Sequence, residues 1–370
     1  MALNYAAVSR LEGRRLLIRD LESGATLPVE SDLIVNAAGA WIDSVNAVLG
    51  LQRRYIGGTK GSHLIIDKPR LRDELDGRMV YFGSADGRIC LVYPFMSHLL
   101  LGSTDLRADD PDRVRCDEDE IAYLLNVLRE VFPGAGVKAD DVVYRYSGVR
   151  PLPFSEAGDT GEISRDHSIK VDESPDGGPP VLSLVGGKWT TFRGFSEEAA
   201  DEILKRLGRA RRVQTRTLAI GGGKGFPTTD SERSAWLARL ESAYALEPRR
   251  SERLLERYGT RARDIAAYCA AGVDRPLSAA ASLTERELQY LCRHEMVVHL
   301  TDLLFRRSPV AVSGSLTSAL IGEALGVAAG VLDWNGERQR LEREMTEALA
   351  REHGVRLEFN AFGPVPMADA

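Results

Sequence analysis

The chain has 370 residues, of which 44% are hydrophobic and 28% are charged, a composition typical of a soluble protein that can bury a large core. Its length exceeds the roughly 100 to 200 residues of a single domain, so we expect two domains. The formal net charge of -6 and the pI near 5.7 exclude a broad basic surface for nucleic acid.

Residues 1–220 predict a mixed α/β domain. One helix is clear from Asp117 to Phe132, because Asp117 and Glu120 form a capping-box-like pair ahead of an apolar stripe. Short β-rich runs alternate with turns at Arg15–Arg19, Ser62–Ile66, Ile89–Tyr93 and His98–Leu101.

The pattern changes at Gly221–Pro227, a glycine-rich segment that predicts a linker. Beyond it, apolar residues recur with a period of about 3.6 and predict helices at Asp230–Leu246, Arg250–Tyr258, Thr284–Phe305, Leu316–Val327 and Gly336–His353. We therefore expect an α/β domain at 1–220, a linker at 221–229, a helical domain at 230–356 and a polar tail at 357–370.

The junction from Gly186 to Arg193 joins a predicted buried strand, Val181–Val185, to a helix. Gly186 and Gly187 allow a ligand to approach the backbone closely, and Lys188 adds a full charge to the partial positive charge of the helix N-terminus. The Walker spacing is missing. These residues suit a phosphate or an electron-rich ring, and on their own they equally suit an ordinary glycine-rich turn.

Other segments of the sequence favour the interpretation of this junction as a ligand-binding site over that of an ordinary turn. They are Asp32–Trp41, Lys60–His63, Gly102–Asp105, Arg145–Pro153, Ser164–His167 and Arg293–Arg307. Together with the glycine junction, and in this order, they resemble the FAD-dependent glycerol-3-phosphate dehydrogenases from about Val8 to about Val355. The resemblance implies the α/β (α+β) fold of FAD-dependent oxidoreductases, followed by an all-α C-terminal domain.

The resemblance also implies an activity, the oxidation of sn-glycerol 3-phosphate to dihydroxyacetone phosphate. Electrons would pass through FAD to quinone, or to oxygen as in oxidase relatives. The implied setting is the cytoplasm, with a peripheral contact at the inner face of the membrane and a homodimer as the assembly. A related FAD-dependent amine or hydroxyacid oxidase is an alternative.

Site residues follow from the same resemblance. Arg150 and Arg165 match the substrate arginines, and Arg150 is also an expected catalytic residue. Lys188 matches a lysine near flavin and substrate. Arginine suits a phosphate because its planar fork makes bidentate hydrogen bonds. His63 is the expected general base, since an ordinary histidine pKa suits proton transfer at neutral pH. The expected cofactor contacts are Ala38, Gly39, Trp41, Gly186, Gly187, Lys188, Thr190 and Thr191.

The G-x-G-x-x-G fingerprint of the family is missing from these 370 residues. Gly221–Phe226 comes closest, but phenylalanine replaces its last glycine and Pro227 follows it. We therefore expect an N-terminally truncated form of the fold that carries little FAD by itself. It is either a fragment of an ordinary enzyme or a non-catalytic homologue that acts as an assembly or interaction module.

No metal site is expected. His294 and His299 lie five residues apart, whereas the zincin motif needs four, and Glu295, His299 and Asp302 predict an ion-paired surface of one helix. Cys90, Cys116, Cys269 and Cys292 lack C-x-x-C spacing and predict reduced thiols. Trp41, Trp189, Trp236 and Trp334 show no stacking pattern, so packing in a core or between domains is the default for each.

Overall fold

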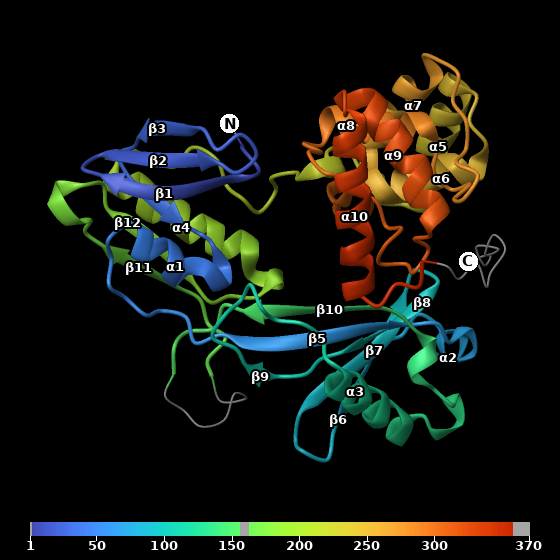
Figure 1. The fold of residues 1–370 in the computed structure, drawn as a ribbon, viewed down its shortest axis with the longest axis horizontal. Coiled ribbons are helices and arrows are strands. Elements are labelled where there is room, and N and C mark those ends of the chain that lie inside the picture. Colours follow the sequence, from blue (N-terminus) through green and yellow to red (C-terminus); the bar gives the residue numbers. More distant parts are fainter. Residues whose placement is uncertain (1, 156–162, 358–370) are drawn as a thin grey trace.

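The computed structural model describes residues 2–155 and 163–357 and contains three β-sheets (Figure 1). The first is an antiparallel sheet of β1 (Ala6–Glu12), β2 (Arg15–Asp20) and β3 (Thr26–Glu30). The second has the order β10-β5-β8-β7-β6, with β9 also pairing with β5. Its strands are β5 (Thr59–Ile66), β6 (Val80–Gly83), β7 (Ile89–Phe95), β8 (His98–Gly102), β9 (Leu106–Arg107) and β10 (Val142–Arg150).

The third sheet has the order β11-β12-β4 and carries the glycine junction. Its strands are β4 (Ile34–Asn36), β11 (Ser168–Asp172) and β12 (Val181–Val185). β4 and β12 are parallel, so both end at the same edge of the sheet. β4 leads through a short turn into α1 (Ile42–Val48), and β12 leads into α4 (Phe192–Arg206).

The two faces of the six-stranded sheet serve different purposes. Leu64 and Ile66 on β5 pack against α2 (Pro69–Leu75) and α3 (Glu118–Val131). Ile65 points to the opposite face, because side chains alternate along a strand, and joins the core of the helical domain. Figure 1 shows α3 and the C-terminal helices on opposite sides of β5.

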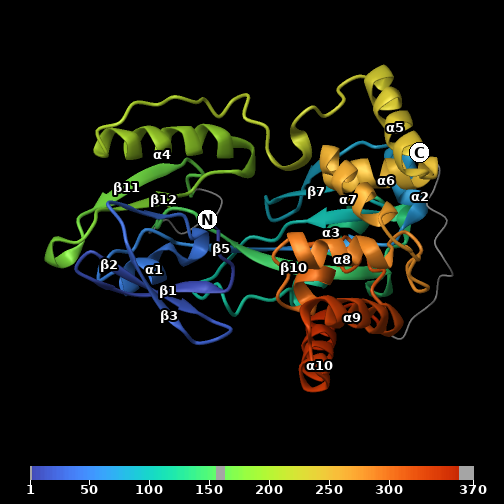
Figure 2. The same ribbon diagram turned by 90° about the horizontal axis from the view of Figure 1, so that it is seen from above.

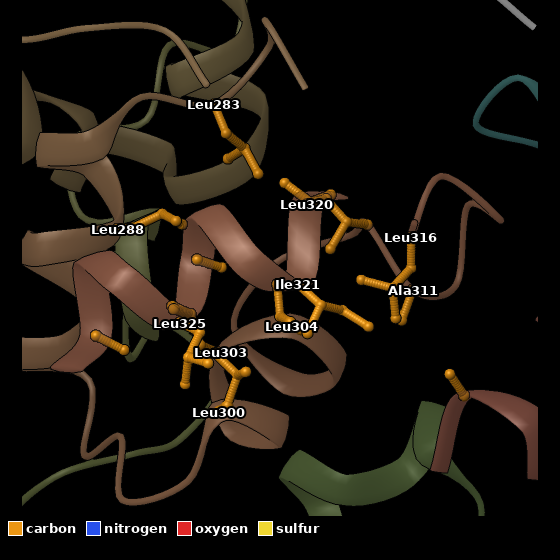
Figure 3. Close-up of a cluster of buried hydrophobic side chains, with 14 of the residues drawn as sticks. Leu283, Leu288, Leu300, Leu303, Leu304, Ala311, Leu316, Leu320, Ile321 and Leu325 are labelled. Carbon is orange, nitrogen blue, oxygen red and sulfur yellow. The ribbon is translucent and has the colours of Figure 1, made fainter. Parts of the chain in front are cut away.

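The C-terminal region is helical, as expected. Leucines from several of its segments pack together, including Leu288, Leu303 and Leu320 (Figure 3). Ile65 from the six-stranded sheet belongs to the same core. Its helices are α5 (Asp230–Tyr244), α6 (Pro248–Tyr258), α7 (Ala262–Ala270), α8 (Glu285–His294), α9 (Ser318–Leu332) and α10 (Gly336–Glu352).

The single helix expected at Thr284–Phe305 is wrong. α8 ends at His294, Met296 adopts a positive φ of 52°, and a π-helical turn follows at Asp302–Arg306. The Asp302 carboxylate accepts hydrogen bonds of 3.0 Å from the amides of Val298 and His299, which starts the second segment anew. The expected common helical face of Glu295, His299 and Asp302 therefore does not exist.

His299 is buried rather than on an ion-paired surface, and it belongs to a contact between the N-terminal sheet and the helical domain. Its Nε2 lies 2.8 Å from Oε1 of Glu22, and its Nδ1 lies 2.8 Å from Oε1 of Glu342. Tyr5 donates a hydrogen bond of 2.6 Å to Asp302. We call Tyr5, Glu22, His299, Asp302 and Glu342 the interface cluster.

The expected linker crosses between α4 and α5 (Figure 2). One of its glycines has a packing role, because a Cβ on Gly222 would lie 2.0 Å from the carbonyl oxygen of Tyr258. The hydroxyl of Thr260 donates to the Gly222 carbonyl at 3.0 Å and to that of Lys224 at 2.8 Å. The linker backbone is therefore fixed against the end of α6.

The four cysteines are unpaired and buried. Within residues 2–155 and 163–357, the helices fall short of the length and apolar character required to cross a bilayer.

Candidate functional site

His63 lies on β5 between a tyrosine and a glycine. Its ring stacks on that of Tyr146 from β10, with the centroids 5.1 Å apart and an interplanar angle of 8°. On its other neighbour, β8, it pairs with Gly102, where a Cβ would lie 2.1 Å from the imidazole. Glycine at position 102 therefore makes room for the imidazole ring.

The electrostatics keep His63 neutral near pH 7. Burial, and to a smaller extent the guanidinium of Arg150, lower the pKa of His63 to about 4. Its Nδ1 is buried and has no hydrogen-bond partner within the described part of the chain. A neutral imidazole can accept a proton from a ligand.

Arg150 ends β10 and shares this face of the sheet. Its guanidinium lies over Gly61, where a Cβ would be 2.1 Å from Nη2. Nη1 forms an ion pair of 3.1 Å with Asp105, and Nη2 donates to the Ser103 hydroxyl at 2.8 Å and to the Thr104 carbonyl at 3.1 Å. Gly61 and His63 are two residues apart on β5, so His63 and Arg150 face the same space.

A buried network supports this face from behind. Oε1 of Glu120, on α3, accepts hydrogen bonds from Ser62 at 2.9 Å and from Thr104 at 2.6 Å. Its Oε2 lies 2.7 Å from Nζ of Lys60. The carboxylate thus ties β5 to the segment that holds Arg150. No sequence signal beyond the capping box at Asp117 marked Glu120.

Arg165 is exposed and lies in the loop before β11, with no ion pair within the described residues. Burial lowers the pKa of Arg150, which Asp105 opposes, and the nearby guanidinium of Arg165 lowers it further. The structure therefore brings His63 and Arg150 together, and Arg165 lies close enough to affect the pKa of Arg150. Lys188 is exposed, and no described hydrogen bond or ion pair links its side chain to these three residues.

The two βα junctions lie beside this face. The amide of Gly186 donates to the carbonyl oxygen of Pro151 at 3.1 Å, directly after Arg150 in the chain. Gly39, Gly186 and Gly187 have φ values of 61°, 77° and 94°, which favour glycine. A Cβ on Gly186 would lie 2.4 Å from the carbonyl oxygen of Asp166.

Aromatic side chains stand exposed at the same junctions. Trp189 is 91% exposed, Trp41 44% and Phe192 43%. Packing in a core is therefore wrong for Trp189 and Trp41, whereas Trp236 and Trp334 do pack against hydrophobic clusters. Exposed rings beside glycine backbone and the start of α4 fit an aromatic, anionic group such as a flavin dinucleotide.

The surroundings of two expected cofactor contacts, Thr191 and Ala38, show hydrogen bonds within the protein. The Thr191 hydroxyl is used locally, because it accepts from the amide of Lys188 at 3.2 Å and donates to its carbonyl at 3.0 Å. Behind Ala38, Asn36 donates to Asn46 at 2.8 Å, and Asn46 donates to Ser183 at 3.1 Å. This amide network fixes the ends of β4 and β12, and sequence reasoning missed it. Thr190 is exposed.

Comparison with known proteins assigns both parts of the chain. Residues 2–193 match the model of the FAD dependent oxidoreductase family, and residues 213–339 match the C-terminal domain of alpha-glycerophosphate oxidase. A glycerol-3-phosphate dehydrogenase of Synechocystis sp. is 34% identical over 84% of this chain and 58% of its own length. The aerobic glycerol-3-phosphate dehydrogenase of Escherichia coli is 30% identical over 78% of this chain and 57% of its own.

The fold has a solved counterpart. The glycerol-3-phosphate dehydrogenase from Bacillus halodurans, complexed with FAD, superimposes with a TM-score of 0.78 and 24% identity, covering 97% of this chain and 71% of that one. The chain spans about three fifths of the length of the curated relatives that it matches.

Proposed function

The chain belongs to the FAD-dependent oxidoreductase family, and we propose that it takes part in catalysing the oxidation of sn-glycerol 3-phosphate to dihydroxyacetone phosphate. FAD is the proposed cofactor and a quinone the proposed electron acceptor. The expected fold, that of an FAD-dependent oxidoreductase with a helical C-terminal domain, is confirmed. The observation that carries the proposed substrate is the convergence of Arg150, Arg165 and a neutral His63 beside the glycine junctions.

The cations have separate tasks in this proposal. Arg165 and Lys188 are exposed and without ion pairs in the described chain, so they are available for the phosphate dianion. Arg150 is held by Asp105 and Ser103, and its guanidinium donates instead to the substrate oxygen at C2, where negative charge develops. Three cations and one carboxylate favour a phosphorylated substrate over an amino acid.

His63 takes the proton of the C2 hydroxyl in this proposal. Its pKa of about 4 leaves it unprotonated near pH 7. A bound FAD would supply the acceptor for the hydride that leaves the substrate carbon. Ala38, Gly39, Trp41 and the residues from Gly186 to Thr191 would hold it.

The test is the kinetics of Arg150→Ala in the FAD-loaded protein, with glycerol 3-phosphate and a dye acceptor. Loss of a charge-assisted hydrogen bond of about 1.5 to 3 kcal/mol lowers kcat/KM by about 10- to 100-fold. Arg113→Ala is the control, because Arg113 is 88% exposed and pairs only at the surface. Kinetics of Arg150→Ala that match those of Arg113→Ala would remove Arg150 from the site.

A contact with the inner face of the membrane is also proposed. Residues 205–229 contain seven Lys or Arg residues and no Asp or Glu, in a chain of net charge -6. Val213, Leu218 and Ile220 within this segment are exposed. Cations interleaved with exposed apolar side chains suit an anionic lipid surface. Equal sedimentation with anionic and neutral vesicles would contradict this contact.

A further inference from the structure

Helix α6 carries a row of arginines on one face. Arg249, Arg253 and Arg257 are spaced by four residues, and Arg250 lies three residues before Arg253, so all four are neighbours on the helix surface. α6 packs beside α5 and α7 in the helical domain, away from the glycine junctions (Figures 1 and 2).

Two of these arginines have carboxylate partners, of which Glu287 is buried and Asp274 partly buried. Arg250 pairs with Asp274, and it also donates to the Thr284 hydroxyl at 3.2 Å. Arg257 pairs with Glu287 at 3.2 Å and donates to the Ser282 carbonyl at 3.0 Å.

Those carboxylates have further donors. Asp274 also accepts from the amide of Arg286 at 3.1 Å, and Glu287 also accepts from the hydroxyl of Tyr258 at 2.7 Å. Neither carboxylate forms a hydrogen bond or an ion pair with Arg253 in the described structure.

Arg253 lies between these two pairs and has no hydrogen bond or ion pair within the described residues. It is only partly exposed, and its Nε is buried without a partner. Burial lowers the pKa of Arg253, the guanidinium of Arg257 lowers it further, Glu287 opposes the shift, and Arg250 and Arg249 add to it. A partly buried guanidinium without an anion is destabilising, and an oxyanion at this position would remove the penalty.

We propose that Arg253, flanked by Arg250 and Arg257, forms an oxyanion-binding site for a phosphate-bearing ligand, separate from the site proposed for catalysis. The planar guanidinium presents paired N–H donors that match the oxygens of a phosphate. Arg250 and Arg257 are already paired with Asp274 and Glu287, so their guanidinium groups do not compete with Arg253 for the ligand. The site gives the helical domain a binding function of its own.

The first test compares the melting temperatures of Arg253→Gln and the parent, with and without inorganic phosphate at matched ionic strength. Without phosphate, Arg253→Gln melts at or above the parent temperature, because repulsion among the arginines is relieved. With phosphate, the parent gains more than the variant, since loss of the charge-assisted bond weakens binding by about tenfold or more. Arg239→Gln is the control, because Arg239 on α5 is exposed and without a described partner.

The second test locates the ion, because phosphate also suits the region of Arg150. Crystals of the full chain soaked with tungstate, a tetrahedral dianion with strong anomalous scattering, should show a peak at the Arg253 guanidinium. The peak should vanish in Arg253→Gln and persist in Arg150→Ala, so that failure of this site and failure of the proposed catalytic site are distinguishable.

Three outcomes overturn the proposal. They are no peak at Arg253, an unchanged peak in Arg253→Gln, and a peak without the difference in melting temperature, which would mean an adventitious ion only. Binding that requires phosphatidylglycerol vesicles and is lost in Arg253→Gln would identify the phosphate as a lipid headgroup rather than a free ligand.

Discussion

The neutrality of His63 in the folded protein has a measurable effect on stability. Its pKa is about 4 in the fold against about 6.5 in the unfolded chain, so the unfolded state binds the proton first as the pH falls. The stability associated with neutral His63 is complete above about pH 6.5 and is lost as the pH falls toward 4. The loss is on the order of 3 kcal/mol.

We therefore expect His63→Asn to flatten the decline of unfolding free energy between pH 6.5 and pH 4, measured by chemical denaturation at several pH values. The free energy of unfolding of His63→Asn at pH 7 is also lower than that of the parent, because the stacking on Tyr146 is lost. That loss does not depend on pH. His294→Asn is the control, since His294 is exposed. A variant that keeps the parent's slope would show that His63 is not the titrating group.

At the scale of single elements, the linker makes a clear prediction because two adjacent glycines differ in their surroundings. Gly222→Ala places a methyl group 2.0 Å from the Tyr258 carbonyl oxygen, whereas Gly223→Ala meets nothing within 4 Å. We expect Gly222→Ala to destabilise the protein by about 1 to 3 kcal/mol and Gly223→Ala to change stability by less than about 0.5 kcal/mol. Thermal unfolding of both variants decides the point, and equal melting temperatures would mean that the linker can move away from α6.

Elements whose signals are local were predicted well from sequence. Val181–Val185 is a strand with the expected bounds, and α3 begins at the expected capping box of Asp117 and Glu120. α1, α2 and α7 went unrecognised, since they are short and their caps are weak. The break after α8 was missed because apolar residues continue through it, and its causes are a positive φ at a methionine and a side-chain carboxylate that caps the next segment.

The candidate site was harder to predict from the sequence than the helices and strands, because much of it depends on contacts between distant segments. His63 and Arg150 stood out by residue type and by resemblance, and their roles remain a prediction. Gly61, Gly102 and Glu120 matter through contacts between strands and helices far apart in the chain, which residue type alone cannot reveal. Periodicity reports which face of an element is buried, and it does not report which polar groups meet there.

At the scale of the whole molecule, the interface cluster joins the first 22 residues to the last helix. Glu22→Gln removes the charge that faces His299 and Arg338, and we expect a loss of about 1 to 3 kcal/mol in the free energy of unfolding. Glu30→Gln is the matched control, because it breaks the exposed pair of Glu30 with Arg15 and costs less than about 0.5 kcal/mol. Similar losses in urea titrations of the two variants would show that the cluster contributes no more than a surface pair.

The shared core of the six-stranded sheet and the helical domain also affects the order in which the chain can fold during synthesis. Ile65 and Leu100 leave the ribosome well before Leu288, Leu303 and Leu320, which cover them in the finished protein. At roughly 5 to 20 residues per second, the sheet waits on the order of ten seconds or more for this cover. One face, supported by α2 and α3, can form early, whereas the other stays apolar and open to chaperones or to other nascent chains until the last helices emerge.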